Sequence, residues 1–142
     1  MSKPVTPLLT VDAVILFNNK KDIVLIIRKN PPFKNSYALP GGFVDVGETV
    51  EDACIRESFE ETNIKVKIIK LIGVFSDPKR DPRAHAVSIA FLCEPRTKKE
   101  KPKAQDDAAE LEIVPISKVK LLKLAFDHKK IIASAGIFKR SN

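Results

Sequence analysis

The chain has 142 residues, which fits one domain with its own hydrophobic core, and no apolar run approaches the length of a membrane span. Residues 1–10 lack the basic-then-apolar layout of a secretory signal, and the two cysteines, Cys54 and Cys93, suggest neither a disulfide framework nor a zinc site. We therefore expect buried thiols in a cytoplasmic protein, and the net charge of +7 favours anionic ligands.

Hydrophobic periodicity and turn residues predict an alternation of strands and helices. In chain order they are a strand at 11–17, a strand at 23–28 that forms a hairpin with the first, a short strand at 37–39, a helix capped by Thr49 that runs to Thr62, strands at 66–75, 86–93 and 110–114, a helical turn at 118–122 and a helix at 126–137. Strands outnumber helices, so we expect an α/β fold in which two helices flank a mixed sheet, in a single domain over residues 1–142.

Three glutamates, Glu57, Glu60 and Glu61, lie at spacings that place them on one face of the first predicted helix. Carboxylates this close repel each other, and a bound divalent cation would relieve the repulsion. Oxygen ligands suit Mg²⁺ or Mn²⁺ better than zinc. The alternative for such a triple is a solvated acidic face.

Two features favour the metal site over the solvated face. On a helical wheel the carboxylates share their arc with Val50, Ala53 and Cys54, which should point inward. The helix also follows residues 39–42, Leu-Pro-Gly-Gly, which predict a turn where the backbone can approach a ligand closely. A carbonyl of this turn would add one more oxygen ligand.

The segment from Gly42 to Ile64 resembles the Nudix box, whose pattern is G, five residues, E, seven residues, R-E, an aliphatic, any residue, E-E, any residue, G, an aliphatic. The positions that match in register are Gly42, Glu48, Arg56, Glu57, Glu60, Glu61 and Ile64. Ser58 stands where an aliphatic is usual, and Asn63 replaces the last glycine. Asparagine is the next best residue for the left-handed turn that ends a helix.

The Nudix resemblance implies an α/β/α sandwich that hydrolyses a nucleoside diphosphate linked to another group, with Mg²⁺ or Mn²⁺ as cofactor. Glu57 and Glu61 would then be the principal metal ligands. Glu60 would be a further ligand or would hold metal-bound water, and the Gly41 carbonyl would complete the set.

The other charged positions of the box have supporting roles in this resemblance. Arg56 would pair with a box carboxylate and keep it ionised and oriented. Glu48 would lie near the metal through water. For Arg56 the alternative is an exposed ion pair with Glu60 at i+4.

The general base in this family is often an acidic residue outside the box, on a loop before a late strand. Residues 106–110, Asp-Asp-Ala-Ala-Glu, occupy that place. We expect Glu110 to be the base, with Asp107 as the second choice. The alternative is a polar turn.

Two further segments resemble the branch of ADP-ribose and ADP-sugar pyrophosphatases: residues 76–85 (SDPKRDPRAH) and 124–128 (LAFDH). Arg80 and Arg83 in the first segment would bind phosphate or ribose oxygens through charge-assisted hydrogen bonds. Arg28, at the end of a strand that faces the glycine loop, would do the same.

Aromatic and histidine side chains in these regions have less specific roles. Phe33 or Phe75 would stack on adenine, although an aromatic side chain is more often part of the core. His85 and His128 have no ligand-like spacing, and we expect both to be structural.

The expected activity is hydrolysis of ADP-ribose to AMP and ribose 5-phosphate. The alternatives are hydrolysis of nucleoside triphosphates, including oxidised ones, and a non-catalytic module that binds ADP-ribose. The basic stretch at 96–103 (RTKKEKPK) lacks the aromatic residues that stack on bases, so we expect a solvated loop rather than a nucleic-acid site. A homodimer is an expectation by resemblance alone.

Overall fold

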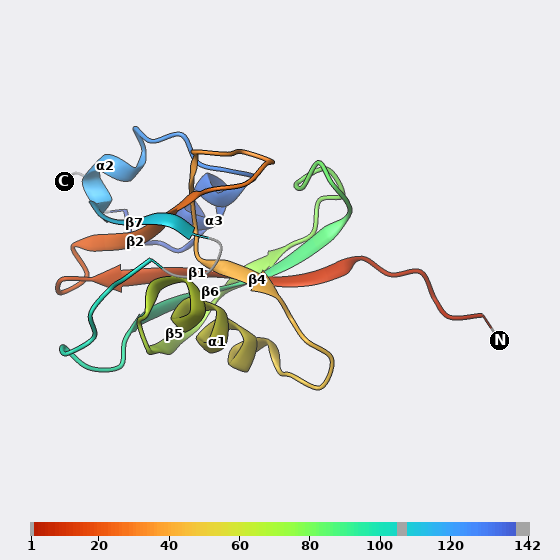
Figure 1. Ribbon diagram of the computed structural model, residues 1–142, viewed down its shortest axis with the longest axis horizontal. Helices are drawn as coiled ribbons and strands as arrows, with labels where there is room; N and C mark the ends of the chain where they lie inside the picture. The colour runs from red at the N-terminus through yellow and green to blue at the C-terminus, as the bar shows by residue number, and fades with distance from the viewer. Residues whose placement is uncertain (1, 105–107, 139–142) are drawn as a thin grey trace.

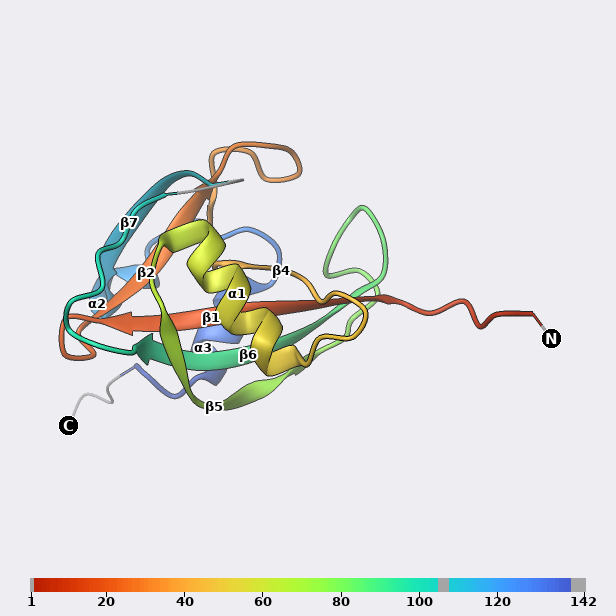
Figure 2. The same cartoon turned by 60° about the horizontal axis from the view of Figure 1, so that its bottom comes forward.

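The computed structural model describes residues 2–104 and 108–138 of the chain (Figure 1). Its elements are β1 (Leu8–Phe17), β2 (Asp22–Arg28), β3 (Tyr37–Ala38), β4 (Gly41–Phe43), α1 (Val50–Thr62), β5 (Val66–Phe75), β6 (Ala86–Pro95), β7 (Ala108–Pro115), α2 (Ile116–Val119) and α3 (His128–Ser134). Helix α1 covers one face of the sheet, and α2 and α3 lie on the other (Figures 1 and 2). The predicted mixed sheet between helical layers is confirmed.

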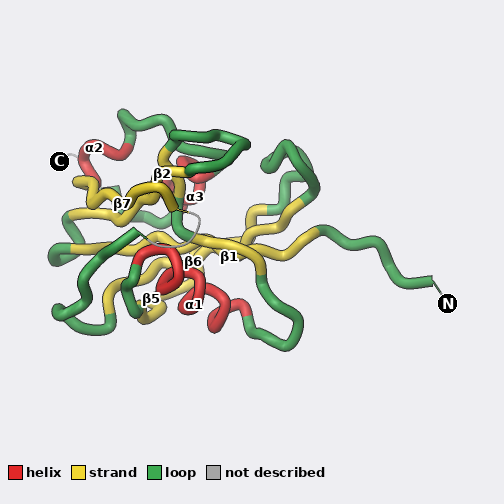
Figure 3. The backbone as a smooth tube through the Cα atoms, in the orientation of Figure 1, coloured by secondary structure: helices red, strands yellow, loops and turns green. Residues whose placement is uncertain are grey.

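The sheet is organised around β1, the strand at its centre (Figure 3). The strand order is β3-β2-β1-β6-β5, with β4 paired to β1 and β7 paired to β2. Strands β1 and β6 run parallel, and the other pairs are antiparallel. Because β1 contacts β4 near its start and β2 near its end, one continuous strand connects the two parts of the sheet.

The side chains of β1 divide the core into two layers. Val11, Ala13 and Ile15 pack in the cluster that includes α1, whereas Val14 and Leu16 pack in the cluster that includes α3. This alternation is the two-residue period of a strand buried on both faces. Asp12 therefore points to the α3 side, where it is buried next to Ser88 and His128.

Helix α1 begins and ends as its sequence predicts. The Thr49 hydroxyl accepts a hydrogen bond from the Asp52 amide, 3.0 Å away, and Asn63 adopts the left-handed conformation that ends the helix, with φ of 63°. Ala53 and Cys54 are buried, as the wheel predicts. The expected metal-binding helix is therefore seated firmly against the sheet.

Several predicted boundaries differ from the structure, and three of them bear on the site. Gly41 and Gly42 belong to a strand rather than a turn, because β4 pairs with β1 from Asp12↔Gly41 to Thr10↔Phe43. The C-terminal helix begins at His128 rather than at 126, because Phe126 has a φ of +52° that no right-handed helix accepts. Helix α2 begins at Ile116, two residues before the predicted start. No helix in the described ranges is long and apolar enough to cross a membrane.

Candidate functional site

Arg56 organises the carboxylates at the start of the site. Its Nε donates to Glu48 at 2.7 Å, and its Nη1 donates to Glu57 at 2.8 Å and to Glu60 at 3.1 Å. Its Nη2 donates to the Phe43 carbonyl at 3.0 Å, which ties the helix to β4. The hydrogen bond from Arg56 lowers the pKa of Glu48 to about 2, and the same contact raises the pKa of Arg56. The predicted pairing of Arg56 with box carboxylates is thus present, and it includes both Glu48 and Glu60.

Glu57 and Glu61 lie against the backbone of the glycine strand. A β-carbon added at Gly42 would lie 2.5 Å from the Glu57 carboxylate, and the Gly41 amide donates to Glu61 at 3.2 Å. The side chain of Glu57 is 15% exposed, and Glu61 is 8% exposed. Burial raises the pKa of Glu57, because the charged form loses hydration. These two carboxylates are the ones that the structure brings to Gly41 and Gly42.

Glu60 lies farther from the glycine strand, with 42% of its side chain exposed. Among the residues that the structure describes, no group of three His, Cys, Asp or Glu side chains forms a ready-made metal cluster. The donor set still fits a hard divalent cation, since the carboxylates of Glu57 and Glu61 lie against the glycine strand, which leaves room for them. Metal binding would have to share the carboxylate oxygens that Arg56 now contacts.

A groove of about 110 Å³ adjoins Glu61. Its lining includes Gly41, Gly42 and Glu61 together with Arg28 and Arg83. The arginines come from β2 and from the loop between β5 and β6, so chain segments far apart in sequence meet here. The structure therefore brings these two predicted ligand-binding arginines to the same groove as Glu61.

Arg80 also reaches the groove, but it is held in a buried ion pair. Its Nε and Nη2 donate to the two Asp127 oxygens at 2.9 and 2.7 Å, and only 5% of its side chain is exposed. Asp12 lies 3.6 Å from the same guanidinium. This arrangement differs from the open clamp expected of Arg80, because Asp127 already occupies its bidentate face.

Sequence reasoning missed the polar network behind the groove. The Leu39 amide donates to Nδ1 of His128 at 3.0 Å, so the ring proton is on Nε2, which lies 3.3 Å from Asp12. The Ser88 hydroxyl donates to the other Asp12 oxygen. His128, which we expected to be structural, belongs to this network and also lines the groove. The signal was a lone aspartate within the apolar run VDAVILF.

Phe126 is a second residue that sequence reasoning did not select. The guanidinium carbons of Arg28 and Arg83 lie 5.0 and 5.7 Å from the centre of its ring. Phe33 contacts the same ring edge-on, with 4.9 Å between centroids. Phe33, a predicted stacking residue, therefore contacts Phe126, which lines the groove. Phe75, the other candidate, packs with the core cluster that includes α3.

Glu110, the expected general base, is not among the described residues that line the groove. Glu110 is exposed on β7, and the strand alternation directs it to the face opposite Leu111, which packs on the α1 side. Its charge raises the pKa of Tyr37, although the largest cause of that shift is a hydrogen bond from Tyr37 to Glu112. Asp107 lies outside the described residues.

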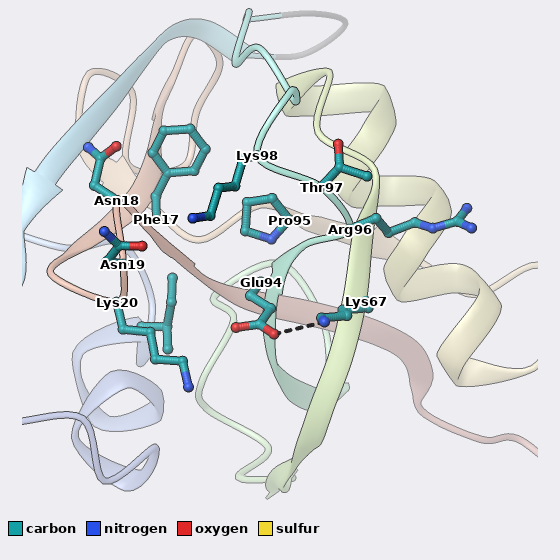
Figure 4. A pocket seen from close by; sticks show the side chains of 11 residues that line it. Phe17, Asn18, Asn19, Lys20, Lys67, Glu94, Pro95, Arg96, Thr97 and Lys98 are labelled. Carbon is teal, nitrogen blue, oxygen red and sulfur yellow. Dashed lines mark ion pairs between the residues drawn. The ribbon is translucent and has the colours of Figure 1, made fainter.

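A larger hollow of about 480 Å³ lies at the opposite end of β1 (Figure 4). Phe17, Lys20 and Lys98 line it, and Lys67 pairs with Glu94 at 3.2 Å. Its lining includes only that one carboxylate among the described residues, so it lacks the chemistry of the helix α1 site. Lys98 belongs to the basic stretch, whose loop is held by the Lys65 amide donating to Glu100 at 2.7 Å.

Comparisons with known proteins place this geometry in a family. A model of the NUDIX domain matches residues 6–135. The chain is 51% identical over 126 residues to an ADP-ribose pyrophosphatase of Methanocaldococcus jannaschii, covering 89% of this chain and 71% of that protein.

Two solved structures are similar over nearly the whole chain. The NUDIX domain of Shewanella oneidensis NrtR complexed with ADP ribose has a TM-score of 0.82 and 28% identity, covering 92% of this chain and 87% of that one. A bifunctional NMN adenylyltransferase/ADP ribose pyrophosphatase of Francisella tularensis, complexed with AMP and a Mn ion, has a TM-score of 0.79 and 33% identity, covering 90% of this chain and 40% of that one. Because the family model spans almost all of the sequence and the box carboxylates lie on the glycine strand, the chain belongs to the Nudix family.

Proposed function

We propose that this protein hydrolyses ADP-ribose to AMP and ribose 5-phosphate in a reaction that requires Mg²⁺. The observation that carries the proposal is the seating of Glu57 and Glu61 against Gly41 and Gly42, beside a groove lined by arginines. The similarity to the Methanocaldococcus jannaschii pyrophosphatase supports the choice of substrate.

The proposed metal ligands are Glu57, Glu61, Glu60 and the Gly41 carbonyl. A divalent cation held there would supply Lewis acidity toward the diphosphate and a water of lowered pKa. Glu57 would be ionised in that state, because a neighbouring cation opposes the effect of burial on its pKa. Mn²⁺ is the alternative cofactor.

Two residues of the network around these ligands have supporting roles in the proposal. Arg56 holds Glu57 and Glu60 in place through its hydrogen bonds, and it also binds Glu48. These contacts orient the carboxylates before a ligand arrives. The side chains therefore lose less conformational entropy when the metal binds.

The substrate would enter the groove with its diphosphate toward Arg28 and Arg83. Guanidinium groups form charge-assisted, paired hydrogen bonds with phosphate oxygens. Arg80 would support this surface from the protein interior, where it is paired with Asp127. Phe33 lies against Phe126, the ring that contacts both arginines, and an adenine ring would stack on an aromatic face there.

The general base stays a prediction. Glu110 would need a movement of β7 or of the substrate to reach the carboxylates of α1, and Asp107 is the other candidate. Comparing Glu110→Gln with Asp107→Asn distinguishes them, because loss of the base lowers kcat and removes the acidic limb of its pH profile.

A non-catalytic ADP-ribose-binding module is the second candidate. The similarity to the ADP-ribose-bound NrtR domain favours it. The carboxylates Glu57, Glu60 and Glu61 favour the enzyme, since a binding module has no need of three acidic side chains near an anionic ligand.

The deciding experiment measures the nucleoside monophosphate released, AMP from ADP-ribose, ADP-glucose and NADH and the corresponding guanine nucleotide from dGTP and 8-oxo-dGTP, with and without Mg²⁺. Metal-dependent release that is fastest on ADP-ribose is the expected result. Faster turnover of a triphosphate would leave the site assignment in place and overturn the substrate. Binding of ADP-ribose without turnover in any metal would favour the binding module.

Three wider expectations belong to the same proposal. Residues 1–142 would act as one hydrolase domain, the protein would work in the cytoplasm, where its buried thiols stay reduced, and it would form a homodimer. Sedimentation of the purified protein would test the last of these.

A further inference from the structure

Phe126 lies in a conformation that bulky residues rarely adopt. Its φ is +52°, in the left-handed region, where a side chain with a β-carbon crowds the backbone. The residues on either side are anchored, since the Ala125 amide donates to the Tyr37 carbonyl at 2.8 Å and the His128 amide donates to the Ala125 carbonyl at 3.1 Å. Strain of this kind persists where the surrounding structure enforces it, and it often accompanies function.

The conformation places the Phe126 ring between two cations. Arg28 and Arg83 lie 5.0 and 5.7 Å from the ring centre, within the range of cation–π attraction. Each guanidinium also has a polar anchor: Arg28 donates to the Pro32 carbonyl at 2.7 Å, and Arg83 donates to Asp81 at 2.8 Å. The ring therefore adds a second point of attachment to each arginine.

We propose that Phe126 is a positioning residue that holds Arg28 and Arg83 ready for the diphosphate of the substrate. This inference rests on the proposed function of the groove. Two cations that share one small surface repel each other, and the negative face of an aromatic ring is the neutral group that attracts both. Phe126 thus adds a neutral contact that the two arginines share, beside the two hydrogen bonds that Arg83 also donates to Asp81.

The proposal predicts a specific kinetic pattern. When the ring is lost, the arginines become mobile, and substrate binding must then order them. The KM for ADP-ribose should rise about tenfold in Phe126→Leu, while kcat changes little. Phe126→Tyr keeps the ring face and should restore a KM close to that of the wild-type protein.

A substrate-free measurement separates this proposal from the proposed function. NMR relaxation of the arginine Nε–H groups reports side-chain order directly. In Phe126→Leu the order of Arg28 should fall most, and the order of Arg83 should fall less because two hydrogen bonds to Asp81 remain. Arg80, which is buried and held by Asp127, should stay rigid as the internal control. Phe126→Tyr should leave all three unchanged.

A third variant keeps the experiment decisive if Phe126→Leu does not fold. Ring-fluorinated phenylalanine at position 126 preserves the shape of the side chain and reduces the negative charge of its face. It should also lower the order of Arg28 and Arg83. Unchanged order of both arginines in the variants that weaken or remove the ring would overturn the positioning role, whatever substrate the protein turns over. Absence of ADP-ribose turnover with reduced arginine order would overturn only the proposed function.

Discussion

A β-carbon at Gly42 would lie 2.5 Å from the carboxylate of Glu57, closer than real side-chain contacts allow. The absence of a side chain at Gly42 is therefore what lets a helix carboxylate rest on the neighbouring strand. The position requires glycine for space and not for backbone conformation, since its φ is not in the left-handed region.

Gly42→Ala should consequently displace Glu57 without unfolding the protein. We expect kcat for ADP-ribose to fall by about tenfold or more, since small misplacements of reacting groups have effects of this size. Gly73→Ala is the matched control, because a β-carbon there would make only ordinary contacts, at 3.6 Å from Phe75. Equal activity of the two variants would contradict the role given to this contact.

Glu57→Gln should lower kcat by orders of magnitude while the fold stays intact, because the change removes a charge and keeps the volume. Metal affinity, measured by calorimetry, should fall with it. Glu51→Gln is the control, since Glu51 is exposed in the first turn of the same helix. Near-normal turnover by Glu57→Gln would show that the metal assignment is wrong.

Arg80 and Arg83 should respond differently to the same substitution. Arg80→Met leaves Asp127 and Asp12 without their cation in a buried site, so we expect a loss of about 3–5 kcal/mol in the free energy of unfolding. Arg83 is half-exposed, and Arg83→Met should cost less than about 1 kcal/mol in stability while raising KM. Urea denaturation and steady-state kinetics check both expectations, and a stable Arg80→Met variant would argue against the buried ion pair.

Ser58→Ala should stabilise the protein. Among the described residues, the Ser58 hydroxyl is the buried side-chain oxygen that has no hydrogen-bond partner, and alanine also has the higher helix propensity. We expect a gain of about 1–2 kcal/mol, seen as a rise of about 3 °C or more in Tm. A lower Tm would mean that the hydroxyl has a partner after all, such as a water molecule.

The Glu48–Arg56 pair should make the free energy of unfolding vary with pH in the acidic range. The pKa of Glu48 is about 2 in the folded protein and 4.5 ordinarily, so its ionised form is favoured by folding. The stabilisation is complete above pH 4.5 and is lost as the pH falls toward 2. Glu48→Gln should therefore show a smaller decrease in the free energy of unfolding across this window, as measured by urea denaturation. Parallel curves for the two proteins would contradict the assignment.

Sequence patterns were sufficient to predict the elements whose limits are set by interactions between residues close together in the chain. The cap at Thr49, the left-handed end at Asn63 and the inward face of α1 follow from spacings within one helix, and all three are present. The hairpin of β1 and β2 was predictable for the same reason, since its turn lies between two apolar runs. The family itself was evident from a motif whose residues lie within 23 positions of each other.

Long-range contacts decided the rest. The glycine pair reads as a turn in sequence, but pairing with β1 makes it a strand, because extended glycine satisfies the backbone hydrogen bonds of the sheet. The predicted start of the C-terminal helix at 126 was wrong, because Phe126 is held in the left-handed region by its anchored neighbours. Neither outcome is encoded in the residues nearby.

The sequence by itself determined which carboxylates share a helix face, because that depends only on the 3.6-residue period. The tertiary structure alone decided that Glu57 and Glu61 rest on glycine backbone, that Asp127 engages Arg80, and that Phe126 gathers Arg28 and Arg83. These groups lie up to about a hundred positions apart in the chain, and only the packing of strands, loops and helices around a common core brings them within a few ångströms.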